Sequence, residues 1–357
     1  MLYRKYRPQT FSQVVGQEHV VQTLKGALLT GRTGHAYLFS GPRGTGKTTI
    51  ARIFAKALNC AERTQNPQNI PCNKCAACLA VNDGRSLDLI EIDAASNRGI
   101  EDIRNLKDSA LVAAPGGNYK IFIVDEVHML TKDAFNALLK ILEEPPSHTI
   151  FILATTEPHK ILLTVLSRVQ RFDFRRLTVK QISEKIKEVA KIEKIGIDDE
   201  GVRAIAASCD GALRDAEVSL SKIQSAASGA ERISVDTVND ILGLISFSYY
   251  PEFFGYLAND DKASAVNLVH KIYELGIDLE HFSKEFIEYL RKIMISKINP
   301  ATLAAVGEEP VVPIGAEITG QKLVRMINAF SAARNEIKLS PIPQLPLELA
   351  ILEVTDS

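Results

Sequence analysis

The sequence lacks an excess of charge of either sign. Its 42 lysine and arginine residues are balanced by 43 aspartate and glutamate residues, so the formal net charge is -1 over 357 residues. A strongly basic chain would attract nucleic acid over its whole surface, and this chain has no such field. Any contact with a nucleic acid must therefore be local or be shared among several chains.

The sequence also has no apolar run of membrane-spanning length, and none follows the charged N-terminal segment 1–8. We therefore expect a soluble, cytoplasmic protein that does not bind a membrane. Internal repeats and low-complexity tracts are missing as well. With 46% hydrophobic and 24% charged residues, the composition is that of a globular protein, and the length predicts two or three domains.

Cysteine is scarce, but four of the five cysteines are clustered in the pattern C-x11-C-x2-C-x2-C, formed by Cys60, Cys72, Cys75 and Cys78. Four thiolates are suited to bind tetrahedral Zn²⁺, which we prefer as a structural metal ion. An iron–sulfur cluster is the main alternative, and disulfides rank third in a reducing compartment. Cys209 stands apart, and we expect it to be a small buried side chain.

The first half of the sequence alternates short apolar runs with helical patterns, which is typical of a parallel sheet with crossover helices. Five runs predict the strands of one five-stranded sheet, at 36–40, 87–92, 120–125, 149–154 and 169–174. Apolar residues three and four apart predict helices at 47–59, 99–113 and 133–142, with Thr131 as the N-cap of the third.

After residue 176 the strand pattern disappears, and helical patterns continue to the end of the chain. The segment 178–181 has the form of a capping box, which favours a helix beginning there. We therefore expect an α/β domain over 1–177, with the cysteine module at about 60–78, a small helical domain over 178–244 and a second helical domain over 245–357.

A glycine-rich segment between the first predicted strand and the first predicted helix matches the phosphate-loop pattern. Backbone N–H groups of such a loop, with the positive end of the following helix, bind phosphate oxygens. Lys47 would neutralise the β and γ phosphates of ATP, and Thr48 would bind Mg²⁺. The expected nucleotide contacts of this segment are Gly41, Pro42, Arg43, Gly44, Thr45, Gly46, Lys47, Thr48 and Thr49.

Two adjacent carboxylates, Asp125 and Glu126, end the apolar run at 120–125. Parallel sheets bind their ligands at the carboxyl ends of the strands. Asp125 would hold Mg²⁺ together with Thr48, and Glu126 would polarise the attacking water. An acidic strand end in solvent is the alternative, but carboxylates at a buried strand cost free energy unless a cation or hydrogen bonds compensate. The pair predicts an ATP hydrolase, and we see no polymerase active site.

Taken together, the motifs resemble the γ/τ subunit family of the bacterial DNA polymerase III clamp loader, a branch of the AAA+ ATPases. The resemblance covers the whole chain and implies an AAA+ domain with a zinc-binding insertion, a helical lid and a helical collar. Besides the phosphate loop and the cysteines, it rests on the segments RKYRP at 4–8, VVGQ at 14–17, EIDAAS at 91–96, DEVH at 125–128 and LKILEEPP at 139–146.

The resemblance implies nucleotide contacts that no pattern would single out. The N-terminal segment of the family packs around the adenine, which implies contacts from Tyr6, Val15 and Gln17. Thr155, at the end of a predicted strand, resembles the sensor of the γ-phosphate and would take part in catalysis. Arg214 resembles the second sensor in the lid and would contact the nucleotide of its own chain; an ion pair on a helix surface is the alternative.

Arg168 resembles the arginine that reaches into the ATP site of a neighbouring subunit and stabilises transition-state charge there. The family segment is Ser-Arg-Cys, and here Val169 replaces the cysteine. The chemistry needs only the guanidinium, so the resemblance still implies a catalytic role in trans, with an ordinary surface arginine as the alternative.

The resemblance also implies partners. Arg98 and Arg104 would face the DNA backbone, although Glu101 and Asp102 lie between them and a solvated helix face is an alternative. The other expected partners are further clamp-loader subunits, bound through collar and AAA+ interfaces, the sliding clamp, primer-template DNA and, indirectly, single-strand-binding protein. Because the chain ends soon after the collar-like helices, we expect the polymerase- and helicase-binding extension of the longer family form to be absent from it.

The expected function is ATP-driven opening of the sliding clamp and its loading onto primer-template DNA in replication. A scaffold subunit that does not hydrolyse ATP is one alternative, but its phosphate loop or acidic pair should be degenerate, and Lys47, Thr48, Asp125 and Glu126 are all present. A motor that translocates on nucleic acid is another, and the cysteine module with Ser167-Arg168 favours the loader.

Overall fold

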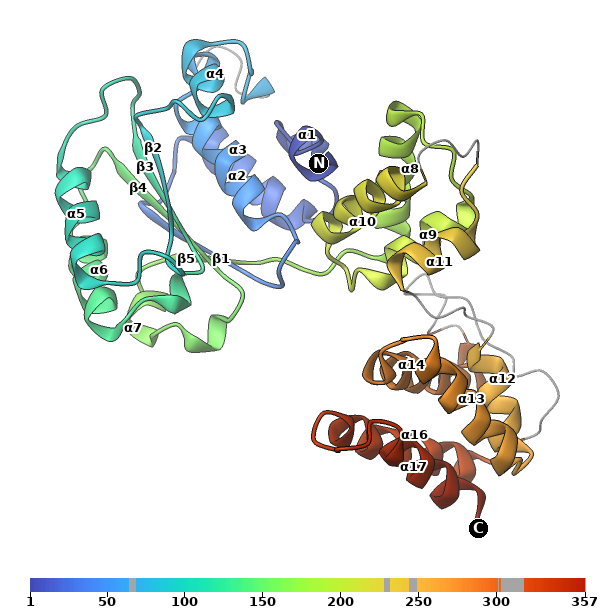
Figure 1. The fold of residues 1–357 in the computed structure, drawn as a ribbon. Coiled ribbons are helices and arrows are strands. Elements are labelled where there is room, and N and C mark those ends of the chain that lie inside the picture. The colour runs from blue at the N-terminus through green and yellow to red at the C-terminus, as the bar shows by residue number, and fades with distance from the viewer. Residues whose placement is uncertain (64–68, 228–231, 244–248, 301, 303–317, 357) are drawn as a thin grey trace. The chain divides into compact units, whose positions relative to one another are not determined.

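The computed structural model describes residues 1–63, 69–227, 232–243, 249–300, 302 and 318–356 (Figure 1). The chain forms two compact units. The first comprises Met1–Lys194 and Ile205–Ser221, and the second comprises Ile195–Ala204 and Lys222–Ser357. Within the described residues, no helix combines the length and the apolar character needed to span a lipid bilayer.

The first unit is built on a five-stranded parallel sheet in the order β2-β3-β4-β1-β5. The strands are β1 (Ala36–Ser40), β2 (Leu89–Asp93), β3 (Lys120–Asp125), β4 (Thr149–Thr155) and β5 (Gln170–Asp173). All residues of β1 and β4 are buried, as expected for inner strands covered on both faces. The predicted five-stranded sheet is confirmed, with shifts of one or two residues at some strand ends.

Helices cover both faces of the sheet (Figure 1). On one face, α2 (Glu18–Thr30) and α3 (Lys47–Leu58) pack with Tyr37 and Phe39 of β1. On the other face, α5 (Ile100–Leu111) and α6 (Lys132–Glu143) pack with Leu38. Successive residues of a strand point to opposite faces, so β1 contributes to both cores.

Short elements complete the α/β part: α1 (Leu2–Lys5), η1 (Phe11–Gln13), η2 (Ala61–Arg63), α4 (Ala76–Asn82), η4 (Val127–Met129), η5 (Pro158–Lys160) and α7 (Leu163–Leu166). The predicted N-cap of α6 is confirmed, because the Thr131 hydroxyl accepts a hydrogen bond of 3.3 Å from the N–H of Ala134.

Four helices follow the sheet: α8 (Val179–Glu193), α9 (Asp199–Ser208), α10 (Leu213–Ala226) and α11 (Val235–Leu242). The predicted capping box opens α8: the N–H of Gln181 donates to the Thr178 hydroxyl at 3.2 Å, and the N–H of Thr178 donates to the Gln181 side chain at 3.0 Å. The division between the two units passes through α9 and α10. The three-domain division stays a prediction, and its boundary at 244/245 lies outside the described residues.

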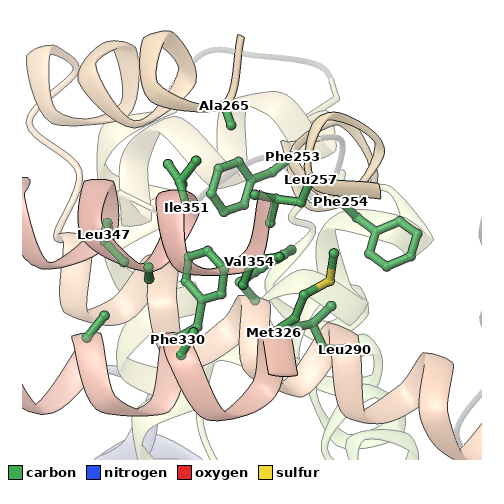
Figure 2. Packing of buried hydrophobic residues seen from close by; sticks show 14 of the residues in the cluster. Phe253, Phe254, Leu257, Ala265, Leu290, Met326, Phe330, Leu347, Ile351 and Val354 are labelled. Atoms are coloured by element: carbon green, nitrogen blue, oxygen red, sulfur yellow. The ribbon is translucent and has the colours of Figure 1, made fainter. Parts of the chain in front are cut away.

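The rest of the second unit is helical: α12 (Tyr249–Ala258), α13 (Lys262–Glu274), α14 (Leu279–Ile298), α16 (Gly320–Ile337) and α17 (Leu345–Thr355). Its core contains an aromatic cluster in which the ring of Phe253 lies 4.8 Å from that of Phe286 and 5.5 Å from that of Phe330, centroid to centroid. Leu347 and Ile351 of α17 pack into the same core (Figure 2). Such edge-to-face rings add to the stabilisation from burial.

Candidate functional site

A cavity of about 620 Å³ lies beside the start of α3, within the first unit. One end is lined by residues 43–49 and by Asp125 and Glu126. The rest of the wall comes from the N-terminal segment, from α3 and α4, and from the segments around Leu177 and α10. Its volume is in the range of small-molecule sites, and its polar end is the predicted phosphate loop.

Two glycines allow the loop to curl between β1 and α3. Gly46, the residue before α3, has a φ of +100°, a conformation that other residues rarely adopt. Gly41 has a φ of +146°, and a Cβ atom there would lie 2.5 Å from the carbonyl oxygen of Phe174. The curled loop ends at the N-terminus of α3, where backbone N–H groups have no partner within the helix.

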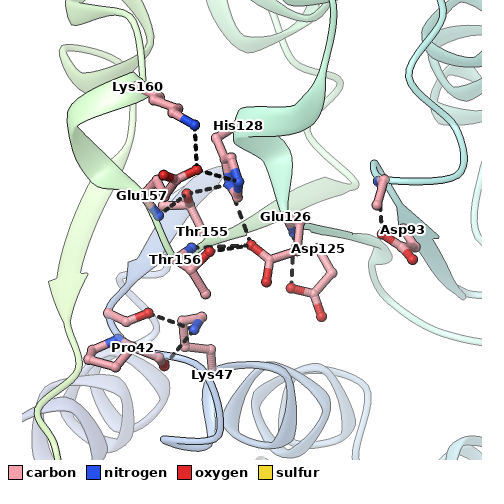
Figure 3. A network of polar contacts seen from close by, with 12 residues as sticks. Pro42, Lys47, Asp93, Asp125, Glu126, His128, Thr155, Thr156, Glu157 and Lys160 are labelled. Atoms are coloured by element: carbon pink, nitrogen blue, oxygen red, sulfur yellow. Dashed lines mark hydrogen bonds and ion pairs between the residues drawn. The ribbon is translucent and has the colours of Figure 1, made fainter. Parts of the chain in front are cut away.

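Lys47 is the first residue of α3, and its side chain is buried within the loop. Its ammonium donates hydrogen bonds to the carbonyl oxygens of Gly41 at 2.7 Å and Pro42 at 2.9 Å (Figure 3). Burial lowers the pKa of Lys47, against the opposing effect of Glu126 and Asp125. A buried cation held by neutral carbonyl groups is suited to an anionic ligand at the same loop.

The two predicted Mg²⁺ ligands lie together at the carboxyl edge of the sheet. The Thr48 hydroxyl on α3 donates a hydrogen bond of 2.8 Å to the Oδ2 atom of Asp125, the last residue of β3. A hydroxyl and a carboxylate oxygen are hard ligands of the kind that Mg²⁺ prefers. The donor set therefore fits the predicted ion.

The side chain of Glu126 is held in place by Thr156, which follows the neighbouring strand β4. It has a φ of +47°, and its Oε2 atom accepts hydrogen bonds from the N–H of Thr156 at 3.2 Å and the hydroxyl of Thr156 at 2.9 Å (Figure 3). The Nδ1 atom of His128 lies 3.4 Å from the same oxygen. The sequence offered no sign of these two partners of Glu126.

Thr155, the predicted γ-phosphate sensor, is fully buried. Its hydroxyl lies 3.0 Å from Nδ1 of His128 and accepts a 3.0 Å hydrogen bond from the N–H of Glu157. The Nε2 atom of His128 lies 3.0 Å from the carboxylate of Glu157, which also pairs with Lys160 at 2.7 Å (Figure 3). Thr155 is not among the described residues that line the cavity.

The cavity wall also carries apolar and cationic side chains outside the phosphate loop. Val15 lines it, as predicted, together with Tyr3, which the sequence did not point to. The guanidinium of Arg214 lies over the ring of Tyr3, 4.9 Å from its centroid, in a cation–π contact. Arg7 donates to the Thr49 hydroxyl at 3.2 Å, and burial lowers the pKa of Arg7 to about 10.

Two predicted base contacts do not line the cavity within the described structure. The Tyr6 hydroxyl bonds to Glu193 on α8 at 2.5 Å. The Gln17 side chain donates to the carbonyl of Arg175 at 2.6 Å and accepts from its N–H at 3.0 Å. Both residues therefore tie segments around the cavity together, and their direct contact with a nucleotide stays a prediction.

Arg168 lies in a second hollow, lined by His35, Leu142, Glu143, Ser167, Arg168, Val169 and Gln170. Its guanidinium pairs with the carboxylate of Glu143 at 2.8 Å and donates to the carbonyl of Thr164 at 2.7 Å. Among the described residues, the two linings have no member in common, so Arg168 does not reach the cavity of its own chain.

The two arginines predicted to face DNA are exposed, Arg98 just before α5 and Arg104 within it. Arg104 forms an ion pair with Glu101 on the exposed face of the helix. The contacts of both arginines with DNA stay predictions.

The sulfur atoms of Cys60, Cys72, Cys75 and Cys78 lie within 4.8 Å of one another, and these thiols form no disulfide. Tetrahedral Zn²⁺ with Zn–S bonds of about 2.3 Å needs sulfurs about 3.8 Å apart, so the cluster fits a single ion. Burial raises the pKa of Cys78. The predicted burial of Cys209 is confirmed.

Lys56 joins this cysteine module to the cavity, a link that the sequence did not indicate. Its side chain is 2% exposed, and its ammonium donates to the carbonyl and side-chain oxygens of Gln9 at 2.9 and 2.8 Å. It also donates to the side chains of Asn73 at 2.8 Å and Asn82 at 2.7 Å. Asn73 lies between Cys72 and Cys75, whereas Gln9 and Asn82 line the cavity.

The five-stranded parallel sheet with its phosphate loop has the fold of the AAA+ proteins. The solved structure of the Thermotoga maritima RuvB Holliday junction branch migration motor gives a TM-score of 0.51 at 20% identity, covering 71% of this chain and 79% of that chain. At this identity the likeness shows the fold alone.

Sequence comparisons identify the family. The model of "DNA polymerase III, delta subunit" matches residues 16–178, and that of "DNA polymerase III subunits gamma and tau domain III" matches residues 233–357. The chain is 34% identical to the DNA polymerase III subunit gamma of Buchnera aphidicola, covering 99% of this chain and 98% of that protein. The chain therefore belongs to the DNA polymerase III γ/τ subunit family.

Two longer relatives match almost the whole of this chain. Identity is 41% to the DNA polymerase III subunit tau of Bacillus subtilis and 37% to that of Escherichia coli, over 99% of this chain in both cases. The chain spans 62% and 54% of the length of these two relatives.

Proposed function

We propose that this chain is an ATPase subunit of a DNA polymerase III clamp loader. ATP binding and hydrolysis would drive the opening of the ring-shaped sliding clamp and its loading onto primer-template DNA in replication, which would place the protein in the cytoplasm. One observation carries the proposal: Lys47, Thr48, Asp125 and Glu126 meet at one cavity in a chain of the γ/τ family.

Each of these side chains has chemistry that suits ATP hydrolysis. The ammonium of Lys47 would bind the β and γ phosphates, while Thr48 and Asp125 would hold Mg²⁺, which neutralises phosphate charge when bound. Glu126 would accept a proton from the attacking water, and its bonds to Thr156 support this role by fixing the carboxylate. Burial of Thr155 beside His128 makes a direct contact with phosphate less favourable than a role in orienting the strand end.

We assign the two arginines to different ATP sites. Arg214, which lines the cavity, would contact the nucleotide of its own chain. Arg168 would act in the site of a neighbouring subunit, a role supported by its separate location beside Glu143. An isolated chain should then bind ATP better than it hydrolyses it.

The C-terminal helices would form the collar that joins the subunits. Leu345, Leu349 and Leu352 recur on one face of α17 and are 38%, 53% and 43% exposed. An exposed apolar stripe of this kind fits a helical partner surface. The partners would be other clamp-loader subunits and the sliding clamp, with primer-template DNA reached by Arg98 and Arg104 and single-strand-binding protein reached indirectly.

A Lys47→Ala variant tests the proposal. We expect the variant to lose ATP binding and clamp loading, whereas Lys132→Ala, which removes an exposed lysine on α6, should behave as the wild type. Hydrolysis should be measured with and without clamp, primed DNA and partner subunits. ATP binding without hydrolysis in the full assembly would indicate a scaffold, and DNA-stimulated hydrolysis that ignores the clamp would indicate a translocating motor.

A further inference from the structure

Glu217 is a buried carboxylate in the wall of the cavity. It lies on α10, one turn after Arg214, and only 6% of the residue is exposed. The structure gives the carboxylate no hydrogen-bond partner from any described residue. Buried polar groups in folded proteins are nearly always hydrogen-bonded, so a carboxylate that faces a cavity in this way points to a ligand.

The described charged side chains around Glu217 do not offset the free-energy cost of burying its carboxylate. Burial raises its pKa to about 7, and Lys185 of α8 acts weakly in the opposite direction. Lys185 is itself paired with Glu188, 2.9 Å away, and Arg214 lies over the ring of Tyr3. The other ionisable side chains on the cavity wall are Arg4, Arg7, Arg43, Lys47, Arg52, Asp125 and Glu126.

The position of α10 indicates which part of a nucleotide Glu217 would meet. The helix begins against the phosphate loop, since a Cβ atom on Gly44 would lie 2.7 Å from the Cβ of Ala212. Glu217 is five residues further along, which at about 1.5 Å per residue places it roughly 7.5 Å from that contact along the helix. The distance is suited to the nucleoside of a nucleotide whose phosphates occupy the loop.

Electrostatics leads to the same assignment. A carboxylate beside phosphate oxygens would repel them, whereas the nucleoside carries N–H and O–H donors that a carboxylate accepts well. Leu177 and Leu213, which also line the cavity, offer apolar contact to a base or sugar.

We propose that Glu217 determines nucleotide specificity by accepting a hydrogen bond from the nucleoside, either from the exocyclic amine of the base or from the ribose 2′-hydroxyl. The inference rests on the proposed nucleotide site and adds to it a residue that reads the nucleoside. Loss of a hydrogen bond to a buried charged group weakens binding by about tenfold or more.

The test is calorimetric binding of three nucleotides to the full chain: ATP, dATP, and the triphosphate of purine riboside, which lacks the amine. The wild type should bind ATP about tenfold more tightly than the analogue that lacks the contacted donor. Glu217→Leu should bind ATP about tenfold more weakly and no longer discriminate against that analogue. Weaker dATP binding assigns the ribose, and weaker purine riboside triphosphate binding assigns the base.

Two further variants serve as controls. Asp215→Asn removes a charge from the exposed side of the same helix and should leave all three affinities unchanged. Glu217→Gln keeps the shape of the side chain, so it separates loss of charge from a folding defect. Wild-type affinities and discrimination in both Glu217 variants would overturn the inference while leaving the nucleotide site intact. ATP binding that is also insensitive to Lys47→Ala would instead refute the site itself.

Discussion

The hydroxyl of Thr156 donates a 2.9 Å hydrogen bond to the carboxylate of Glu126, and the N–H of Thr156 reaches the same oxygen at 3.2 Å. The two residues follow neighbouring strands, β4 and β3. Two donors on one oxygen limit the rotation of the carboxylate. The position of the Glu126 carboxylate, the proposed water-activating group, therefore depends on the end of β4 as well as on the end of its own strand, β3.

Thr156→Val should lower the rate of ATP hydrolysis about tenfold, because it removes one charge-assisted hydrogen bond that orients Glu126. ATP affinity should stay at the wild-type value, since the phosphate loop is unchanged. Single-turnover hydrolysis in the assembled complex, with a separate binding titration, distinguishes the two effects. Thr30→Val, at the exposed end of α2, is the matched control. An unchanged hydrolysis rate in Thr156→Val would refute the orienting role.

Arg168→Ala should leave ATP binding by the isolated chain intact, because Arg168 lies in a different hollow from the cavity. In the assembled complex it should reduce DNA-stimulated hydrolysis by at least about 100-fold, on the scale of arginine fingers. Glu143→Gln removes the carboxylate that pairs with Arg168 and should not slow hydrolysis. Normal turnover by a complex that carries Arg168→Ala would refute the catalytic role and indicate that Arg168 is an ordinary surface arginine.

Elemental analysis of the purified chain should find about one zinc per chain, since four thiolates complete a tetrahedral site. Cys75→Ser should lower the zinc content and the melting temperature, whereas Cys209→Ser, at the buried cysteine outside the cluster, should retain the metal. Iron in place of zinc would establish the alternative cluster, and a metal-free chain of unchanged stability would exclude a structural metal.

Glu217 makes stability depend on pH in a definite direction. Its pKa rises from 4.5 to about 7 on folding, so the folded state holds the proton more tightly. Its burial therefore costs little below pH 4.5, the cost grows as the pH rises from 4.5 to 7, and it levels off above pH 7 at about 3 kcal/mol. Glu217→Gln should raise the melting temperature at pH 8 and change it little at pH 5. Equal shifts at both pH values would contradict the assignment.

The local sequence pattern was sufficient to predict structure where the conformation of a segment depends on that segment's own residues. The strand at 120–125 was predicted to the residue because a continuous apolar run fits an inner strand. Thr131 and the 178–181 capping box were recognised because their hydrogen bonds stay within one helical turn. The loop was predicted from its glycine spacing and the Asp125-Glu126 pair from its place at the end of an apolar run, and the structure brings both to one cavity.

Contacts between segments that are distant in the sequence could not be predicted from local pattern. Nothing in the sequence distinguishes Thr155 from Thr156, and only the strand end shows that Thr156 contacts Glu126. Glu217 could have been noticed as the residue one turn after Arg214, but its burial depends on how α10 packs. Nothing in the sequence marks Lys56, whose four acceptors come from three separate segments.

The contacts of Lys56 bear on how this protein can be dissected. The cysteine module resembles an insertion that could be trimmed from a minimal ATPase, yet its Asn73 supplies one of the four oxygens around the buried ammonium of Lys56. A shortened chain would leave that charge underpaired inside the first unit, a defect that typically costs several kcal/mol. Any deletion of the module should therefore be accompanied by an apolar residue at position 56.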